Sequence, residues 1–127
     1  MIFTCYFSGL GPRSGDAVSL CYQQPPGFRL PVAEELAPPS GMYWKLLRRK
    51  MSERRFSQIY SIRFGMLDPA EIATKYDGKI LVAWEGYEDM EKKVLKFSHR
   101  HLVAEWLRRN GYEVMELDPV PVKRKVL

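Results

Sequence analysis

The chain has 127 residues, of which 46% are hydrophobic, and a formal net charge of +5. This length accommodates one domain with a hydrophobic core and is too short for two. No apolar run approaches the roughly 20 residues that span a bilayer, and the N-terminus lacks the pattern of a secretory signal. We therefore expect a cytoplasmic protein with no membrane partner. Cys5 and Cys21 lie in apolar runs that favour buried thiols over a disulfide or a metal pair, so neither a metal nor a cofactor is expected.

The positive charge is concentrated in one segment. Residues 45–63 hold seven Lys and Arg side chains against Glu53 alone, which gives this segment a net charge of +6. Three further basic residues, Lys123, Arg124 and Lys125, follow near the C-terminus. The rest of the chain is therefore mildly acidic.

The N-terminal part of the chain has a β pattern. Apolar residues at 1–7 and 17–22 predict two strands. The glycine-rich loop 8–15 between them could turn backbone amides toward a phosphate, but it lacks the ending of a Walker loop, so a plain turn is the favoured interpretation. Residues 23–40 contain five prolines, and a short helical turn at 32–36 is compatible with their sequence. A connection of this length either covers a binding site or wraps the surface.

Helical segments are expected in the middle of the chain. Ser40 and Ser52 each precede an apolar stripe with helical spacing, which predicts two helices or one bent helix. Asp68 and Pro69 are a cap and a first-turn residue, and they predict a further helix that ends near Tyr76.

The last third of the chain is typical of a βαβ unit. The apolar run 80–84 predicts a strand over 79–84 that is covered on both faces, and a charged loop over 85–97 follows it. Ser98 is the expected cap of a helix that stops at Gly111, and 112–117 resumes a strand. We therefore expect an α/β protein with a mostly parallel central sheet flanked by helices. Its single domain is expected to cover residues 1–118, and a basic tail 119–127.

A candidate site follows from this topology. A right-handed crossover brings the end of the first strand and the start of the helix to one edge of the sheet, where open α/β sheets bind ligands. His99 in the first helical turn should have a lowered pKa and serve as a general base, Arg100 suits a phosphate or carboxylate, and Glu85 adds a carboxylate. The predicted catalytic residues are thus Glu85, His99 and Arg100, and the predicted ligand-binding residues are Ser98, Ser19 and Tyr22. The alternative is structural: Arg100 pairs with Glu85, and His99 bonds a backbone carbonyl.

The basic segment 45–63 and the basic tail support a second hypothesis, nucleic-acid binding through phosphate contacts. The residues expected to contact nucleic acid are Lys45, Arg48, Arg49, Arg54 and Arg55. Trp44, Phe56 and Tyr60 are candidate stacking surfaces. A solvated helix face and a protein-interaction module that meets an acidic partner are the alternatives.

Two runs of the sequence carry a resemblance to a known family. Residues 80–85 read Ile-Leu-Val-Ala-Trp-Glu, and residues 98–107 begin with Ser-His-Arg. They resemble the signature of the uncharacterised domain-of-unknown-function family 488, in which an apolar strand ends in Cys-aromatic-Glu and Cys-His-Arg opens a helix. The likeness extends over 17–117, but Ala83 and Ser98 stand at the two cysteine positions. The matching residues are Glu85, His99 and Arg100. The resemblance implies an α/β sheet and a shared crevice, with no assigned reaction.

Overall fold

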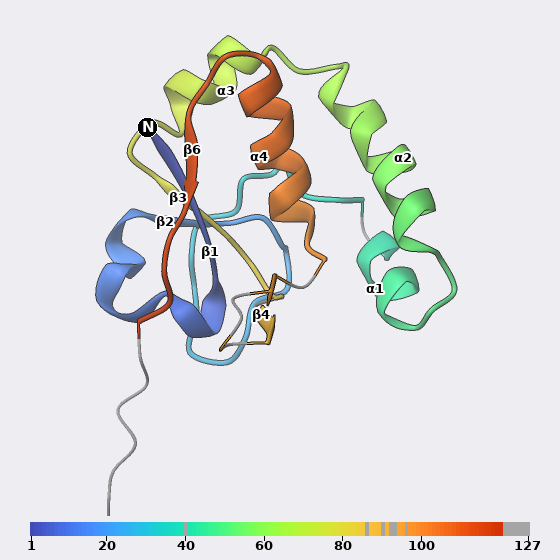
Figure 1. Ribbon diagram of the computed structural model, residues 1–127, viewed down its shortest axis with the longest axis horizontal. Helices are drawn as coiled ribbons and strands as arrows, with labels where there is room; N and C mark the ends of the chain where they lie inside the picture. The colour runs from blue at the N-terminus through green and yellow to red at the C-terminus, as the bar shows by residue number, and fades with distance from the viewer. Residues whose placement is uncertain (40, 86, 90, 92–93, 96, 121–127) are drawn as a thin grey trace, which may run out of the picture.

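A central sheet of parallel strands organises the computed structural model, which describes residues 1–39, 41–85, 87–89, 91, 94–95 and 97–120. The strand order is β2-β3-β1-β6, and all three pairings are parallel (Figure 1). The strands are β1 (Ile2–Tyr6), β2 (Ala17–Ser19), β3 (Ile80–Ala83) and β6 (Val114–Glu116). The predicted α/β class with a parallel sheet is therefore confirmed.

Four α-helices accompany the sheet in the described ranges. They are α1 (Met42–Leu47), α2 (Glu53–Phe64), α3 (Pro69–Lys75) and α4 (His99–Arg109). The predicted caps of α2 and α3 are confirmed, because Ser52 Oγ accepts from Arg55 N at 3.1 Å and Asp68 Oδ1 accepts from Ala70 N at 2.9 Å. The cap predicted at Ser40 lies outside the described residues. None of the helices described is long and apolar enough to cross a membrane.

The glycine-rich loop after β1 folds into two short 3-10 segments, Phe7–Gly9 and Gly11–Asp16. Arg13 holds this loop closed by donating to the carbonyl oxygens of Leu10 at 3.0 Å, Gly9 at 2.9 Å and Asp118 at 2.8 Å. Its guanidinium is thus engaged with carbonyl groups, as in a plain packed turn. Val120 N also donates to Gly9 O at 2.9 Å, so packed structure continues to residue 120.

Two predicted elements differ from those observed. The charged loop expected over 85–97 contains an antiparallel hairpin of β4 (Tyr87–Asp89) and β5 (Val94–Leu95). The strand expected over 17–22 ends at Ser19, because Ser19 Oγ bonds the backbone of Cys21 on both sides: it donates to O at 2.6 Å and accepts from N at 3.0 Å. This local bond turns the chain away from the sheet.

The strands of the predicted βαβ unit do not pair with each other. β1 lies between β3 and β6, and it pairs in register with both: Phe3 aligns with Ile80 and with Met115. β3 is buried at every residue, as predicted for an inner strand. The carboxyl ends of β1, β3 and β6 therefore lie next to one another.

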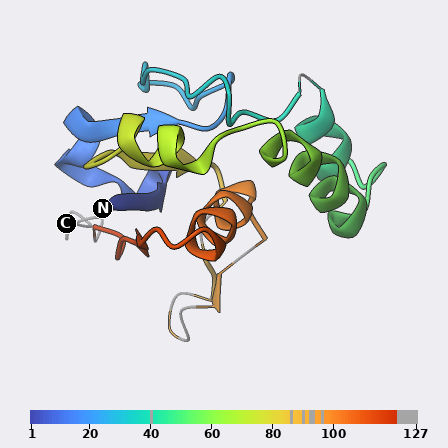
Figure 2. The same cartoon turned by 90° about the horizontal axis from the view of Figure 1, so that it is seen from above.

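Each face of the sheet has its own hydrophobic core. On one face, residues of α2, α3 and α4 such as Phe56, Tyr60, Ile72 and Leu107 form a single buried cluster with the strands. On the other face, no described α-helix provides the cover: Phe7 of the first 3-10 segment, Leu10, Phe28 and Leu30 pack on the strands. Figures 1 and 2 show α1 and α2 standing beyond α4, on the side away from β6.

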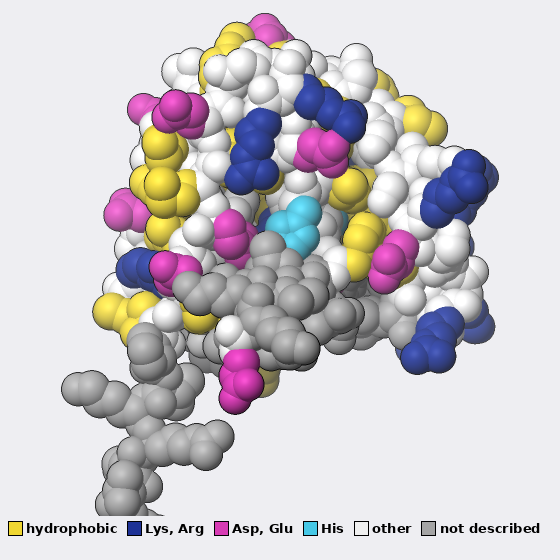
Figure 3. Space-filling view, in the orientation of Figure 1, with side chains coloured by type: hydrophobic (Ala, Val, Ile, Leu, Met, Phe, Trp, Pro, Cys, Tyr) yellow, Lys and Arg dark blue, Asp and Glu magenta, His cyan; other side chains and the backbone are white. Residues whose placement is uncertain are grey.

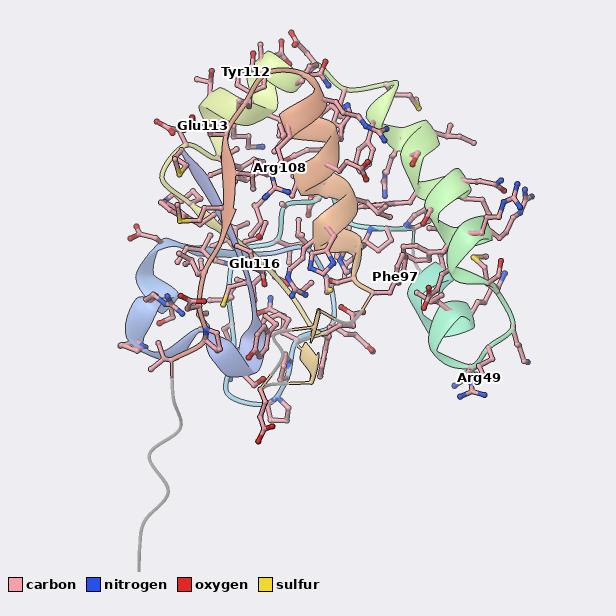
Figure 4. The ribbon with its side chains drawn as sticks, in the orientation of Figure 1. Arg49, Phe97, Arg108, Tyr112, Glu113 and Glu116 are labelled. Atoms are coloured by element: carbon pink, nitrogen blue, oxygen red, sulfur yellow. The ribbon has the colours of Figure 1, made fainter. Side chains whose placement is uncertain are left out.

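The edge strand β6 is covered in part by a side chain. Arg108, in the last turn of α4, donates to Val114 O from Nη2 at 2.7 Å and from Nε at 3.3 Å. Figure 4 shows Arg108 between α4 and β6.

Candidate functional site at the carboxyl edge of the sheet

The segments that follow β2 and β3 meet the first turn of α4 at the carboxyl edge of the sheet. Ser98 Oγ donates to Glu85 Oε2 at 3.0 Å and accepts from Arg100 N at 3.4 Å. The predicted cap and the predicted proximity of Glu85 to the helix start are both confirmed. A carboxylate beside a helix N-terminus is a stabilising arrangement.

Arg100 is completely buried, and its charge is already paired. Nε and Nη2 donate to Glu116 Oε1 and Oε2, each at 2.9 Å, and Nη1 donates to the backbone carbonyl of Glu85. The guanidinium also lies 5.7 Å from the ring centroid of Tyr6. An anion that binds this guanidinium would have to displace the Glu116 carboxylate. The binding of an anion by Arg100 therefore stays a prediction.

Glu116 lies at this edge and is not among the residues predicted for the site. Burial raises the pKa of its carboxyl. The hydrogen bonds and charge of Arg100, together with a 2.7 Å bond from Thr4 Oγ1, lower this pKa by more, so the net shift is downward. The carboxylate is therefore ionised at neutral pH. Figure 4 shows Glu116 on β6 beside the first turn of α4.

His99 is 1% exposed and contacts a cysteine. Its Nε2 lies 3.5 Å from Cys21 Sγ, and the imidazole also bonds the backbone of Leu20. The pKa of His99 is lowered, as predicted, but the main cause is burial; the charge of Arg100 adds to it, and Glu85 opposes it. The imidazole is therefore neutral at pH 7.

Cys21 follows β2 and was not among the predicted site residues. Burial and the charge of Glu85 raise the pKa of its thiol to about 12, against a smaller opposing bond from the Trp84 backbone. Cys21 and His99 thus form a contact between a neutral thiol and a neutral imidazole. A nucleophile and a base within hydrogen-bond reach are the minimum geometry for thiol chemistry.

His101 lies in the same helical turn as His99 but on a different side of the helix. Burial and the neighbouring Arg100 lower its pKa to about 4, against the opposing charges of Glu116 and Glu85. Among the described residues its Nε2 is buried without a hydrogen-bond partner. In Figure 3, a histidine side chain is visible at the surface, close to acidic and basic side chains.

The remaining predicted ligand residues differ in exposure. Ser19 is fully buried and bonds the Cys21 backbone, so its observed contact positions Cys21. Tyr22 is 55% exposed, and Trp84 is 38% exposed with its Nε1 donating to Gln23 O at 2.9 Å. Two accessible aromatic residues therefore follow β2 and β3 at this edge.

Of the site residues, only Glu116 lines one of the cavities described. One hollow of about 340 Å³ lies between α2 and α4 and is lined by Phe64, Trp106 and Arg109, among others. A wider one of about 670 Å³ runs along β6 beside Tyr112 and Met115. In the described ranges, no group of three or more His, Cys, Asp and Glu side chains is placed to hold a metal ion.

The predicted nucleic-acid-binding residues are all exposed, but two of the predicted stacking residues are not. Lys45, Arg48, Arg49, Arg54 and Arg55 are exposed. Phe56 and Tyr60 are 0% exposed and belong to the core, so the prediction that they stack on bases is wrong. The side chain of Trp44 and the basic residues 123–125 lie outside the part of the chain that is described.

Comparisons with known proteins add no relative. No family model matches the chain, and neither the curated proteins nor the solved structures provide a match. The resemblance to domain-of-unknown-function family 488 therefore stays a prediction.

Proposed function

We propose that the carboxyl edge of the sheet binds a small polar ligand of the nucleoside or sugar class, with Glu85 as the acceptor for its hydrogen-bond donors. The observation that carries this proposal is the gathering of buried polar groups. The polar or charged residues below 2% exposure in the described ranges are Thr4, Ser19, Ser98, His99 and Arg100. Each bonds a group at or beside this edge. Buried polar groups are costly, and their concentration at the carboxyl edge of a parallel sheet is typical of a binding site.

The charges at this edge favour a neutral ligand with N–H or O–H donors. The charged groups are Arg100 on one side and the two glutamates, Glu85 and Glu116, on the other, and His99 is neutral. Arg100 is already bound by Glu116 in a bidentate pair. Glu85 is partly exposed, and one of its two carboxylate oxygens accepts from Ser98. A carboxylate accepts several hydrogen bonds, so Glu85 retains capacity for a ligand.

The aromatic residues beside Glu85 suit the flat or apolar face of such a ligand. Trp84 immediately precedes Glu85 and is fixed by its bond to Gln23 O and by edge-to-face packing on Phe7, 5.7 Å between centroids. Tyr22 is the more exposed aromatic of the pair. Rigid aromatic groups next to a carboxylate are a common way to bind bases and sugar rings.

Cys21 and His99 supply the proton-transfer part of the proposal. His99 Nε2 lies 3.5 Å from Cys21 Sγ, and in the tautomer that carries its proton on Nδ1 it would accept the Cys21 thiol proton. Whether turnover occurs is decided by following a bound ligand over time. Loss of turnover in His99→Asn with retained binding would assign the imidazole to proton transfer.

The test is a ligand panel read by thermal unfolding and by NMR. Nucleosides and monosaccharides are compared with inorganic phosphate, using the intact chain. A nucleoside or sugar should stabilise the protein, and Glu85→Gln should weaken that ligand about ten- to a hundredfold, because a bond to a charged acceptor is lost. Glu105→Gln is the matched control, since Glu105 pairs with Arg109 on the exposed face of α4.

Two results would contradict the proposal. If phosphate alone stabilises the protein and Arg100→Gln abolishes the effect, the edge is the anion site that the sequence suggests. If Glu85→Gln and Glu105→Gln behave alike, Glu85 does not receive a ligand.

A further inference from the structure

The surface formed by α1, α2 and the turn between them carries an unbalanced positive charge. The exposed cations of this basic surface are Lys45, Arg48, Arg49, Lys50, Arg54 and Arg55. Glu53 is the one acidic residue in the sequence between positions 45 and 63. In Figure 3, dark blue side chains project on the side of the molecule where Figure 1 places α1 and α2.

The cations of the basic surface do not take part in the described ion pairs or hydrogen bonds of the fold. In the described part of the chain, the ion pairs connect other residues, and none of these six side chains forms a hydrogen bond. Arg63 of α2 provides the contrast, because its Nη1 donates to the backbone carbonyl of Ala37. Arg63 ties α2 to the body of the protein, whereas the six exposed cations face solvent.

Arg49 occupies a backbone position that suits glycine. Helix α1 ends with Lys50 N bonded to Lys45 O at 2.9 Å and Arg49 N bonded to Leu46 O at 3.1 Å, the hydrogen-bond pattern of a Schellman motif. Arg49 has a φ of 56°, and it is the only non-glycine residue with a positive φ in the described ranges. Left-handed backbone is unfavourable for residues with a Cβ.

Two positions in the first turn of α2 are also occupied against local preference. Glu53 follows the cap Ser52 and suits the helix dipole, but Arg54 and Arg55 come next in the same turn, where the dipole favours acidic residues. At three positions, then, arginine stands where the fold alone favours another residue. Departures from local preference concentrate at functional surfaces, because function rather than stability maintains them.

We propose that the basic surface binds the phosphate backbone of duplex nucleic acid without reading its sequence. Four of the six cations are arginines, whose planar guanidinium matches a phosphate with two parallel hydrogen bonds. Phe56 and Tyr60 are buried in the core, so neither is available for stacking on unpaired bases. Binding through phosphates alone favours a duplex over a single strand, because the duplex has the higher charge density. This site shares no residue with the ligand site proposed at the carboxyl edge and does not depend on it.

Salt dependence is the first test. Binding of fluorescent duplex DNA and duplex RNA of two unrelated sequences is measured by anisotropy over a range of salt concentrations. If all six cations contact phosphates, the logarithm of the association constant falls with the logarithm of salt concentration with a slope of about −5. The two sequences should bind equally, and single strands more weakly.

Arg49→Gly separates binding from folding, because the two effects have opposite signs. Glycine relieves the left-handed backbone, so the melting temperature should stay the same or rise. Loss of one phosphate contact should lower the affinity about five- to tenfold near 0.1 M salt and reduce the slope by about 1. Arg49→Lys retains the charge and should bind within about threefold of the parent. The small loss is expected because the lysine ammonium cannot form the two parallel hydrogen bonds of the guanidinium.

Arg29→Gln is the matched control for net charge. Arg29 is an exposed arginine between Phe28 and Leu30, which pack on the other face of the sheet, so its loss should leave binding unchanged. Equal weakening by Arg29→Gln and Arg49→Gly would overturn the proposal, as would absence of binding at low ionic strength. Equally tight binding of polyglutamate would assign the surface to an acidic protein instead.

Discussion

The guanidinium of Arg100 and the carboxylate of Glu116 form a bidentate ion pair in which the arginine side chain has no exposed surface. Glu116 remains 16% exposed, and it also accepts from Thr4 Oγ1. The pair joins the first turn of α4 to the end of β6 and, through Thr4, to the middle of β1. It fixes the helix start that presents Ser98 and His99 to the carboxyl edge.

Glu116→Gln should be strongly destabilising. It removes the charge that compensates a fully buried arginine, and breaking a buried pair from one side costs about 3–5 kcal/mol. Urea unfolding followed by circular dichroism measures the change. Glu113→Gln, at an exposed position of the same segment, should stay within about 0.5 kcal/mol of the parent. A loss for Glu116→Gln no larger than for Glu113→Gln would show that the ion pair contributes little.

Acid should destabilise the protein in two stages. His101 has a folded pKa of about 4 against an ordinary value of 6.5, so the unfolded chain takes up its proton first as the pH falls. The contribution of His101 to stability is full above pH 6.5 and is lost as the pH falls toward 4. His99 acts in the same direction. Below its ordinary value of 4.5, the lowered pKa of Glu116 adds a second loss, because the stabilising carboxylate is then protonated.

His101→Asn isolates the first stage. Asparagine carries no titrating group, so the free energy of unfolding should depend less on pH between 6.5 and 4 than in the parent. Denaturant titrations at pH 7, 5.5 and 4.5 measure this slope. An unchanged slope would show that His101 accepts a proton in the folded protein as readily as in the unfolded chain.

Both thiols should react slowly in the folded protein. Cys5 is 0% exposed and Cys21 7% exposed, and burial is the main cause that raises the pKa of each. Thiolate is the reactive form, so alkylation by iodoacetamide at pH 8 should be slow natively and complete in denaturant. Mass spectrometry assigns the site, with Cys5→Ala as the control. Rapid native labelling of Cys21, but not of Cys5, would show that His99 activates the Cys21 thiol.

Local signals in the sequence predict the elements and the helix caps. Ser52, Asp68 and Ser98 each bond a backbone amide of the first helical turn, as their positions indicate. The meeting of Glu85 with Ser98 is also predictable, because the handedness of the crossover brings strand end and helix start to one edge.

Contacts that depend on strand order are not predictable from local patterns. Glu116 meets Arg100 only because β1 lies between β3 and β6 and places the end of β6 beside α4. One signal exists: Glu116 stands two positions after the buried Val114, so strand alternation directs both side chains to the same, covered face. Cys21 and His99 are 78 positions apart, and their contact requires the chain to turn after Ser19.

Periodicity identifies an apolar face but not what covers it. Phe56 and Tyr60 lie four positions apart, a spacing equally suited to a core stripe and to a stacking surface. In the fold, Tyr60 packs edge-to-face on Phe64 at 4.9 Å and its hydroxyl donates to Leu36 O. That tertiary packing makes the stripe part of the core.

The position of Arg108 has a consequence for how the molecule meets copies of itself. β6 ends the sheet, and an open strand edge invites a neighbouring chain to add to it. Because the outward carbonyl of Val114 already accepts from the Arg108 guanidinium, an incoming strand would have to displace a charged group to pair there. The Arg108 side chain thus disfavours the addition of a strand from a second copy of the protein at the β6 edge, even at high protein concentration.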